Sequence, residues 1–181
     1  ARVKAVVQTA AVLGQEFEVR LLSGMLRDDP QLAEQVREAE RETIWTALSE
    51  LRYLFRHALL RDAAYAMQLR ARLRELHRLA AEVIERIHAA DLPASAADLA
   101  YHYRHAEDGP QERRYARMAG EHAAARYANA DAAAFFSRAL ELTPAADGVA
   151  RYELLLARER IYDLQGDREA QRADLAALER L

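Results

Sequence analysis

The chain has 181 residues, of which 51% are hydrophobic and 30% charged, and its formal net charge is -3. This composition is typical of a folded globular protein, and the slightly acidic balance gives no overall basic field for nucleic acid. Cysteine is absent, which excludes a disulfide framework and a thiolate zinc site and fits a cytoplasmic protein. No apolar run approaches the ~20 residues of a membrane-spanning helix, so we expect no membrane partner.

Three short helices are predicted in residues 3–41. The apolar side chains of the first recur at helical spacing, with Gly14 following at the position of a C-cap: Val3, Val6, Val7, Ala10 and Leu13. A second helix is predicted over residues 17–26. A third is predicted over residues 31–41, where Leu32 and Val36 form the apolar face and most other side chains are charged.

The period of the sequence then changes. Residues 43–48 are mostly β-branched or aromatic, residues 52–56 can pair with them, and Ser49-Glu50 can form the turn. Three short helices followed by a hairpin are the layout of a winged helix. Because residues 44–54 could also continue as a helix, that alternative stays open.

A helical stretch without Gly or Pro follows the hairpin and runs to Ile87. Its apolar residues recur at alternating four- and three-residue steps and form one stripe: Leu69, Leu73, Leu76, Ala80, Val83 and Ile87. Arg70, Arg74 and Arg78 repeat every four residues on a neighbouring stripe. They could meet phosphates, but interspersed Glu residues favour a solvated face or contact with a partner domain.

Residues from Arg113 onward resemble a tetratricopeptide repeat, a 34-residue helical hairpin. Small and aromatic residues fall on the packing positions of that pattern: Gly120 at position 8, Ala132 at 20, Phe136 at 24, Ala139 at 27 and Pro144 at 32. We expect Gly120 and Ala132 to let the paired helices approach closely, and Phe136 to fill the gap to the next pair. A second, more degenerate repeat is predicted from about Tyr152.

Three segments resemble the region behind the ATPase module of multidomain signal-transduction ATPases of the STAND type: LGQEFEVRLL, YLFRHALLRDAAY and LRELHRLAAEVIE. The resemblance covers most of the chain and implies a winged helix followed by a tetratricopeptide array, often fused to adenylate cyclase or transcription-activator domains. The sequence contains no GxxxxGK[ST] phosphate loop. We therefore expect no enzyme and no cofactor in this chain, with ATP or ADP bound by a missing module of a larger parent protein.

The same resemblance gives His57 a role as a nucleotide sensor. In related ATPases a Met-His-Asp motif places its His against ADP phosphate and holds the off state. Residues 55–62 are similar in layout, with Ala58 where that motif carries Asp. A histidine at the start of a helix can donate its ring N–H to a phosphate. The alternative is a surface or capping histidine.

Other kinds of site receive little support from the sequence. DNA binding through residues 31–41 is not expected, because this segment carries more acidic than basic side chains. His102, His105 and His122 could come together, but no carboxylate or Cys completes a metal-ligand spacing, so we expect no metal. We find no arrangement of catalytic residues.

The sequence therefore predicts a mainly α fold in three parts. These are a winged-helix-like unit with a small β-hairpin over residues 1–60, long connecting helices over 61–92, and an α-α superhelix of tetratricopeptide-like hairpins over 93–181. We expect a non-catalytic regulatory piece of a signalling ATPase, in which the first part docks on the ATPase module and the repeats hold a protein partner or peptide in a groove. A DNA-binding winged-helix regulator and a passive tetratricopeptide scaffold stay open as alternatives.

Overall fold

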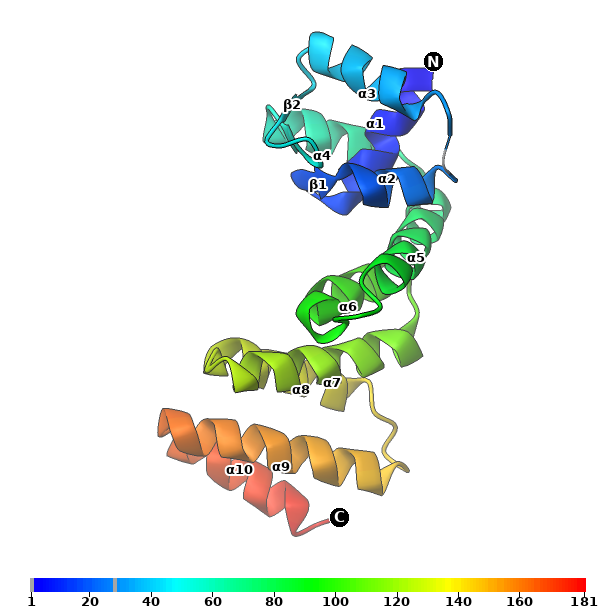
Figure 1. Cartoon of the computed structure of the whole chain (residues 1–181). Helices are drawn as coiled ribbons and strands as arrows, with labels where there is room; N and C mark the ends of the chain where they lie inside the picture. The colour runs from blue at the N-terminus through cyan, green and yellow to red at the C-terminus, as the bar shows by residue number, and fades with distance from the viewer. Residues whose placement is uncertain (1, 28) are drawn as a thin grey trace. The chain divides into compact units, whose positions relative to one another are not determined.

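The computed structural model describes residues 2–27 and 29–181, apart from the side chain of Arg2. The chain divides into two compact units, residues 1–87 and 88–181. The described residues are mainly helical, and a small antiparallel sheet lies in the first unit (Figure 1). No described helix is both long enough and apolar enough to cross a membrane.

The first unit combines helices with three short strands, and β3 is the central strand of the sheet. The elements in chain order are α1 (Arg2–Leu13), β1 (Glu16–Glu18), α2 (Val19–Met25), α3 (Leu32–Arg41), β2 (Trp45–Ala47), β3 (Arg52–Phe55), α4 (Ala58–Ala66) and α5 (Arg70–Ile87). The predicted hairpin is present as β2 and β3, so the alternative of a continuous helix there is wrong. The second helix begins only at Val19, because Phe17 lies in β1 and pairs with Tyr53.

Aromatic side chains explain why this segment forms strands. Trp45 is 1% exposed, and its ring meets those of Phe17 and Phe55 at centroid distances of 5.2 and 5.6 Å in edge-to-face contacts. Its Nε1–H donates to the carbonyl oxygen of Val36 at 3.0 Å. The indole therefore joins the sheet to α3 while its one polar group stays satisfied.

The stretch that leads to Ile87 is two helices and not one. α4 ends at Ala66, α5 begins at Arg70, and the side chain of Gln68 between them donates to the carbonyl oxygen of Gln8 at 3.0 Å. Within α5 the predicted stripe is largely buried, together with residues of α1 and α2. Leu69, by contrast, precedes the helix and is 79% exposed, so it does not belong to the stripe.

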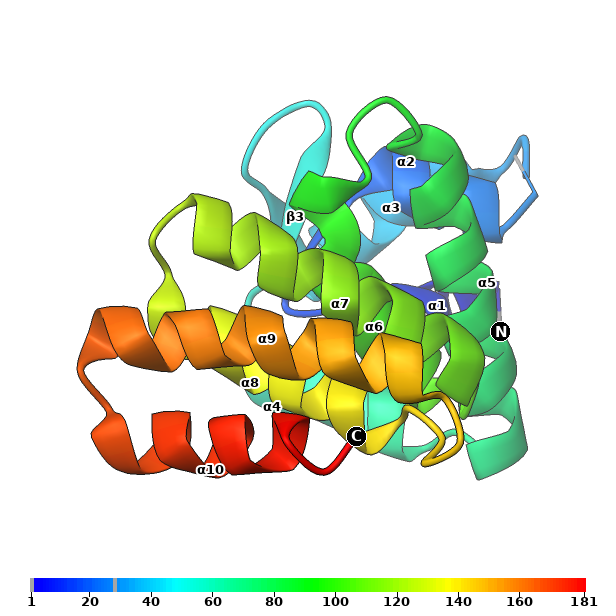
Figure 2. The same cartoon turned by 90° about the horizontal axis from the view of Figure 1, so that it is seen from below.

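The second unit is a succession of helices in which each packs against the next (Figure 2). Its elements are η1 (Pro93–Ser95), α6 (Ala96–His105), α7 (Gly109–Ala125), α8 (Asn129–Glu141), α9 (Gly148–Gln165) and α10 (Arg168–Leu178). Asp108, Asp147 and Asp167 stand at the N-caps of α7, α9 and α10, and each carboxylate accepts a hydrogen bond from the backbone N–H three residues on. These caps fix where the helices start.

Candidate protein-interaction surfaces

Helix α4 carries large apolar side chains in solvent. No residue of the helix is buried, Leu59 is 82% exposed, and Met67, which follows the last helical residue, is 65% exposed. Single exposed apolar residues are ordinary, but a helix that buries none of its residues and exposes several is typical of an interaction surface.

Polar bonds help to hold α4 on the rest of the first unit. The Arg61 guanidinium donates to the carbonyl oxygen of Ala11 in α1 at 3.0 Å. The Tyr65 hydroxyl lies 2.9 Å from Nε2 of His77, which is fully buried in α5. The helix can therefore keep its place while Leu59 and Leu60 remain on the outside.

A groove of about 580 Å³ lies between α1, α3 and α4. Val3 and Val7 of α1 lie four residues apart, and so do Ala63 and Met67 on the α4 side. The apolar lining consists of these residues and of Ile44, Leu60 and Ala64. Lys4 from α1 and Glu38 and Glu42 from the end of α3 add charge to it. The volume lies within the range of about 300–1,000 Å³ that is usual for ligand pockets.

His57 stands immediately before α4, at the N-cap position. Its backbone is extended, with φ -131° and ψ 124°, its side chain does not cap the helix, and the residue is exposed. Its carbonyl oxygen accepts hydrogen bonds from the backbone N–H groups of Leu60 and Arg61. The imidazole is therefore accessible at the positive end of a helix that also presents apolar side chains.

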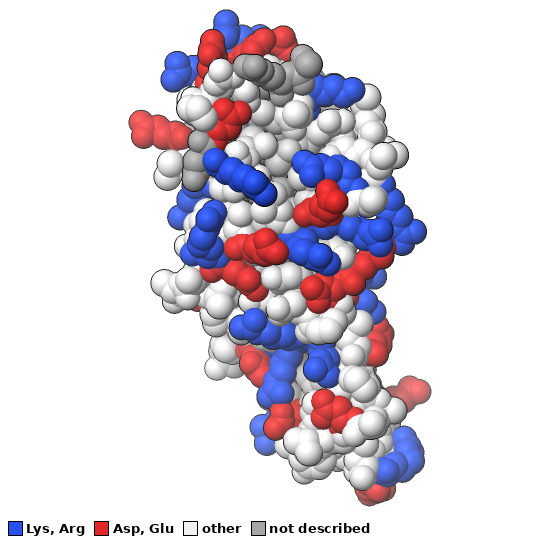
Figure 3. Space-filling model, turned by 90° about the vertical axis from the view of Figure 1, so that its right-hand side faces the viewer, with Lys and Arg blue, Asp and Glu red and all other residues white. Residues whose placement is uncertain are grey.

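The predicted arginine row lies on α5, where Arg70, Arg74 and Arg78 are all exposed. Arg72 beside them forms an ion pair with Glu75 at 3.2 Å. On the face of the molecule drawn in Figure 3, Lys and Arg side chains are interspersed with Asp and Glu. Such mixed charge fits a solvated or protein-contacting surface better than a phosphate track.

The residues assigned to the repeat pattern lie in and after the hairpin of α7 and α8. Ala132 and Ala139 are fully buried, and Pro144 is exposed between α8 and α9. A Cβ placed on Gly120 would be 2.8 Å from ring carbons of Phe136. The ring therefore packs against the partner helix of its own hairpin, whereas contact with the next pair stays a prediction.

Two carboxylates are buried between helices of the second unit and paired with arginines. Glu112 of α7 accepts hydrogen bonds from the guanidinium of Arg138 in α8 at 2.6 and 3.1 Å. Asp174 of α10 accepts two from Arg158 of α9, at 2.5 and 2.9 Å. Arg158 also donates to Ser137 Oγ at 2.8 Å and so bonds to α8 as well as α10.

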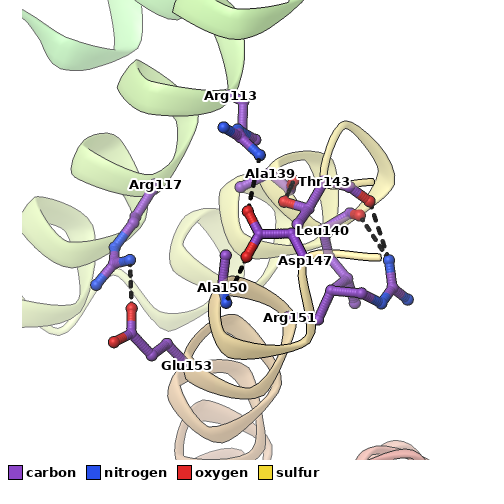
Figure 4. A network of polar contacts seen from close by, with 9 residues as sticks. All are labelled: Arg113, Arg117, Ala139, Leu140, Thr143, Asp147, Ala150, Arg151 and Glu153. Carbon is purple, nitrogen blue, oxygen red and sulfur yellow. Dashed lines mark hydrogen bonds and ion pairs between the residues drawn. The ribbon is translucent and has the colours of Figure 1, made fainter. Parts of the chain in front are cut away.

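Further polar contacts join α7, α8 and α9 (Figure 4). Arg117 of α7 forms an ion pair with Glu153 of α9 at 2.7 Å, and Arg113 approaches Asp147 at 3.5 Å. Arg151 of α9 donates to the carbonyl oxygen of Thr143 at 3.1 Å. The sequence did not predict these pairs, because partners up to 36 residues apart leave no periodic signal.

A smaller groove of about 290 Å³ lies between α6, α7 and α8. The aromatic rings of Tyr101 and Phe135 and the side chain of Arg104 line it, together with buried Ala100 and Ala116. Arg138 and Glu112 also line it, as the ion pair between α7 and α8. Its mainly apolar lining suits a peptide side chain.

The three histidines considered as metal ligands differ in environment. His102 is buried, and its pKa falls to about 4 because burial disfavours the charged ring, with the nearby His105 adding to the effect. His105 is exposed and His122 half-buried. Within residues 2–27 and 29–181, no cluster of three or more His, Asp or Glu could hold a metal ion.

No family model, curated protein or solved structure matches this chain.

Proposed function

We propose that the chain is a non-catalytic regulatory part of a signalling ATPase. In this account the first unit is a winged helix that docks on a nucleotide-binding module, and the second is a tetratricopeptide-like array that binds a protein partner or peptide. The observation that carries the proposal is α4, which buries none of its residues, exposes Leu59 and Leu60, and begins at the accessible His57.

The element order of the first unit supports the winged-helix assignment. Three helices precede a two-stranded hairpin, and the short strand β1 joins the sheet beside β3. A DNA-binding role is less favoured, because Glu34, Glu38 and Glu40 on α3 outnumber Arg37 and Arg41. An acidic helix repels the phosphates that it would have to approach.

The second unit supports the repeat assignment through its packing. α7 and α8 form a hairpin closed by Gly120 and Phe136, and α9 and α10 follow as a second pair. The groove that contains Tyr101 and Phe135 offers space for a partner side chain. Repeat arrays commonly bind partners on extended surfaces of this kind.

Regulation requires that the partner-binding surface of the repeats be coupled to the nucleotide site of the docked module. A partner that binds the repeats can shift the nucleotide state only if it binds one arrangement of the protein more tightly than the other. ATP or ADP would be bound by the nucleotide-binding module, because this sequence contains no phosphate loop. His57 would contact the ADP phosphate from the start of α4 and slow ADP release.

The test measures the rate at which fluorescent ADP leaves the natural polypeptide that carries this sequence, with His57 and with His57→Ala. We expect His57→Ala to release ADP several-fold faster, while His122→Ala, a change in the second unit, leaves the rate unaltered. If the natural polypeptide binds no nucleotide, the ATPase account is wrong. Unchanged release with His57→Ala would remove the sensor role and favour a passive scaffold.

A further inference from the structure

The groove between α1, α3 and α4 is lined mainly by apolar side chains, with charged side chains on its α1 and α3 sides. Val7 lines it from α1 and Leu60 from α4, and Ala63 and Met67 follow Leu60 at steps of three and four residues. Rows at this spacing match the i, i+3/i+4 and i+7 side chains of an entering helix.

The charges at its edges differ from one side to the other. Glu38 and Glu42 stand one helical turn apart at the end of α3, and Lys4 stands on α1. Among the described residues no ion pair involves Glu38 or Glu42. Two carboxylates that form no ion pair with another described residue, beside a mainly apolar lining, favour a partner with positive charge on that side.

We propose that this groove binds an amphipathic helix of a partner protein, with a row of Leu-sized side chains against the apolar lining and a basic edge against Glu38 and Glu42. The inference goes beyond the proposed function, in which the first unit docks on the nucleotide-binding module and the repeats bind the protein partner. The partner's opposite edge, facing Lys4, is neutral or acidic.

A second copy of this chain fits the groove less well. Among the described helices of the first unit, α4 is the one that exposes large apolar side chains, Leu59 and Leu60. Its charged side chains are Arg61 and Asp62. Arg61 is already bonded to Ala11 and paired with Asp62. This helix therefore has no basic edge to place against Glu38 and Glu42, and the groove is better matched by a different protein.

The experiment uses two labelled 14-residue peptides with the same leucine spacing, one with Lys and one with Glu along the edge that faces Glu38 and Glu42, and both with Gln at the other polar positions. Fluorescence anisotropy measures the binding of each peptide to this chain at physiological salt. We expect the Leu/Lys peptide to bind at least about tenfold more tightly than the Leu/Glu peptide, with affinity falling as salt rises. The variant Leu60→Glu should weaken binding at least about tenfold, because it places a charge in the apolar lining.

Two further variants locate the site. Val149→Glu changes a residue that is 75% exposed in the second unit and should leave binding unaltered. The double variant Glu38→Lys, Glu42→Lys should remove the preference for the Leu/Lys peptide. Since Leu60 is 44% exposed, Leu60→Glu should still fold, and circular dichroism checks that it does.

Three results would overturn the inference. The first is that the two peptides bind equally tightly, and the second is that Leu60→Glu binds the Leu/Lys peptide as tightly as the wild type does. The third is that the chain associates with itself and Leu60→Glu abolishes this association, which would mean that a second copy occupies the groove. If peptide binding fails while ADP release still depends on His57, only the helix inference is wrong. If the peptide binds as expected but ADP release does not depend on His57, the groove inference stands and the proposed nucleotide-sensing role is wrong.

Discussion

Gly120 of α7 lies so close to Phe136 of α8 that a Cβ built on the glycine would stand 2.8 Å from two carbons of the aromatic ring. Real Cβ contacts are essentially never that short, and Phe136 is buried. Gly120→Ala should therefore lower the free energy of unfolding by about 1–3 kcal/mol, although alanine is the better helix former. Urea unfolding followed by circular dichroism measures the change.

Gly148→Ala is the control for this substitution. Gly148 is the first residue of α9, and a Cβ there would meet nothing within 4 Å. We expect no loss of stability, or a gain of about 0.4 kcal/mol, because alanine lowers the conformational entropy of the unfolded chain. Equal effects of the two alanines would show that Gly120 is not a packing position.

Arg138→Ala should destabilise the second unit by about 1–3 kcal/mol, because it leaves the carboxylate of Glu112 buried without its guanidinium. Glu141 also pairs with Arg138, but its side chain is 64% exposed. Glu141→Gln should therefore cost less than about 0.5 kcal/mol. The two variants are compared by their midpoints of chemical unfolding. A larger loss of stability in Glu141→Gln than in Arg138→Ala would contradict the prediction that the buried pair of Arg138 with Glu112 is the stabilising one.

His102 should make the stability of the second unit fall in mild acid. Burial first, and the nearby His105 second, lower the pKa of His102 from 6.5 to about 4 in the folded chain, so the fold favours the neutral ring. The stability that the neutral His102 ring contributes is fully present at pH values well above its unfolded pKa of 6.5. It is lost as the pH drops toward the folded pKa of about 4, because the unfolded chain takes up the proton first. At pH 5 the loss from this group is about 2 kcal/mol.

Comparison with His102→Gln isolates that contribution. Unfolding free energies of both chains are measured at pH 7.5 and pH 5, and the wild type should lose about 2 kcal/mol more than the variant. An identical pH dependence in both chains would mean that His102 does not titrate as its burial requires.

Truncation to alanine should have little effect on stability at Leu59 and a large effect at Leu76. Leu59 is 82% exposed on α4, whereas Leu76 is 2% exposed on α5. Leu59→Ala should change stability by less than about 0.5 kcal/mol, and Leu76→Ala should cost about 2–5 kcal/mol. Thermal unfolding of the two variants checks the difference. A large cost at Leu59 would show that this side chain supports the fold and is not there for a partner.

Local sequence signals were enough to predict a mainly helical chain with a small β-hairpin. The aromatic and β-branched residues around Trp45 marked the hairpin, and the small residues near Gly120 marked a close helix pair. Both signals come from residues that must pack at short sequence separation, so their spacing is visible in the sequence.

Other features depend on tertiary contacts that the spacing does not encode. The break between α4 and α5 contains no Gly or Pro, and the Gln68 side chain there bonds to the distant carbonyl of Gln8. Phe17 fitted a helical pattern but pairs with β3 as a strand. Similarly, the sequence offered His57 and the arginine row as sites, yet did not reveal that α4 leaves its own apolar residues exposed.

Amide hydrogen exchange across α4 tests the central claim most directly, because it reports whether another module covers this helix. The exchange of residues 58–66 is compared in the 181-residue chain alone and in the natural polypeptide with ADP bound. The account predicts exchange at least about tenfold slower in the ADP-bound polypeptide, equivalent to about 1.4 kcal/mol of added protection. Equal rates in the two samples would mean that nothing docks on α4, and would contradict the account.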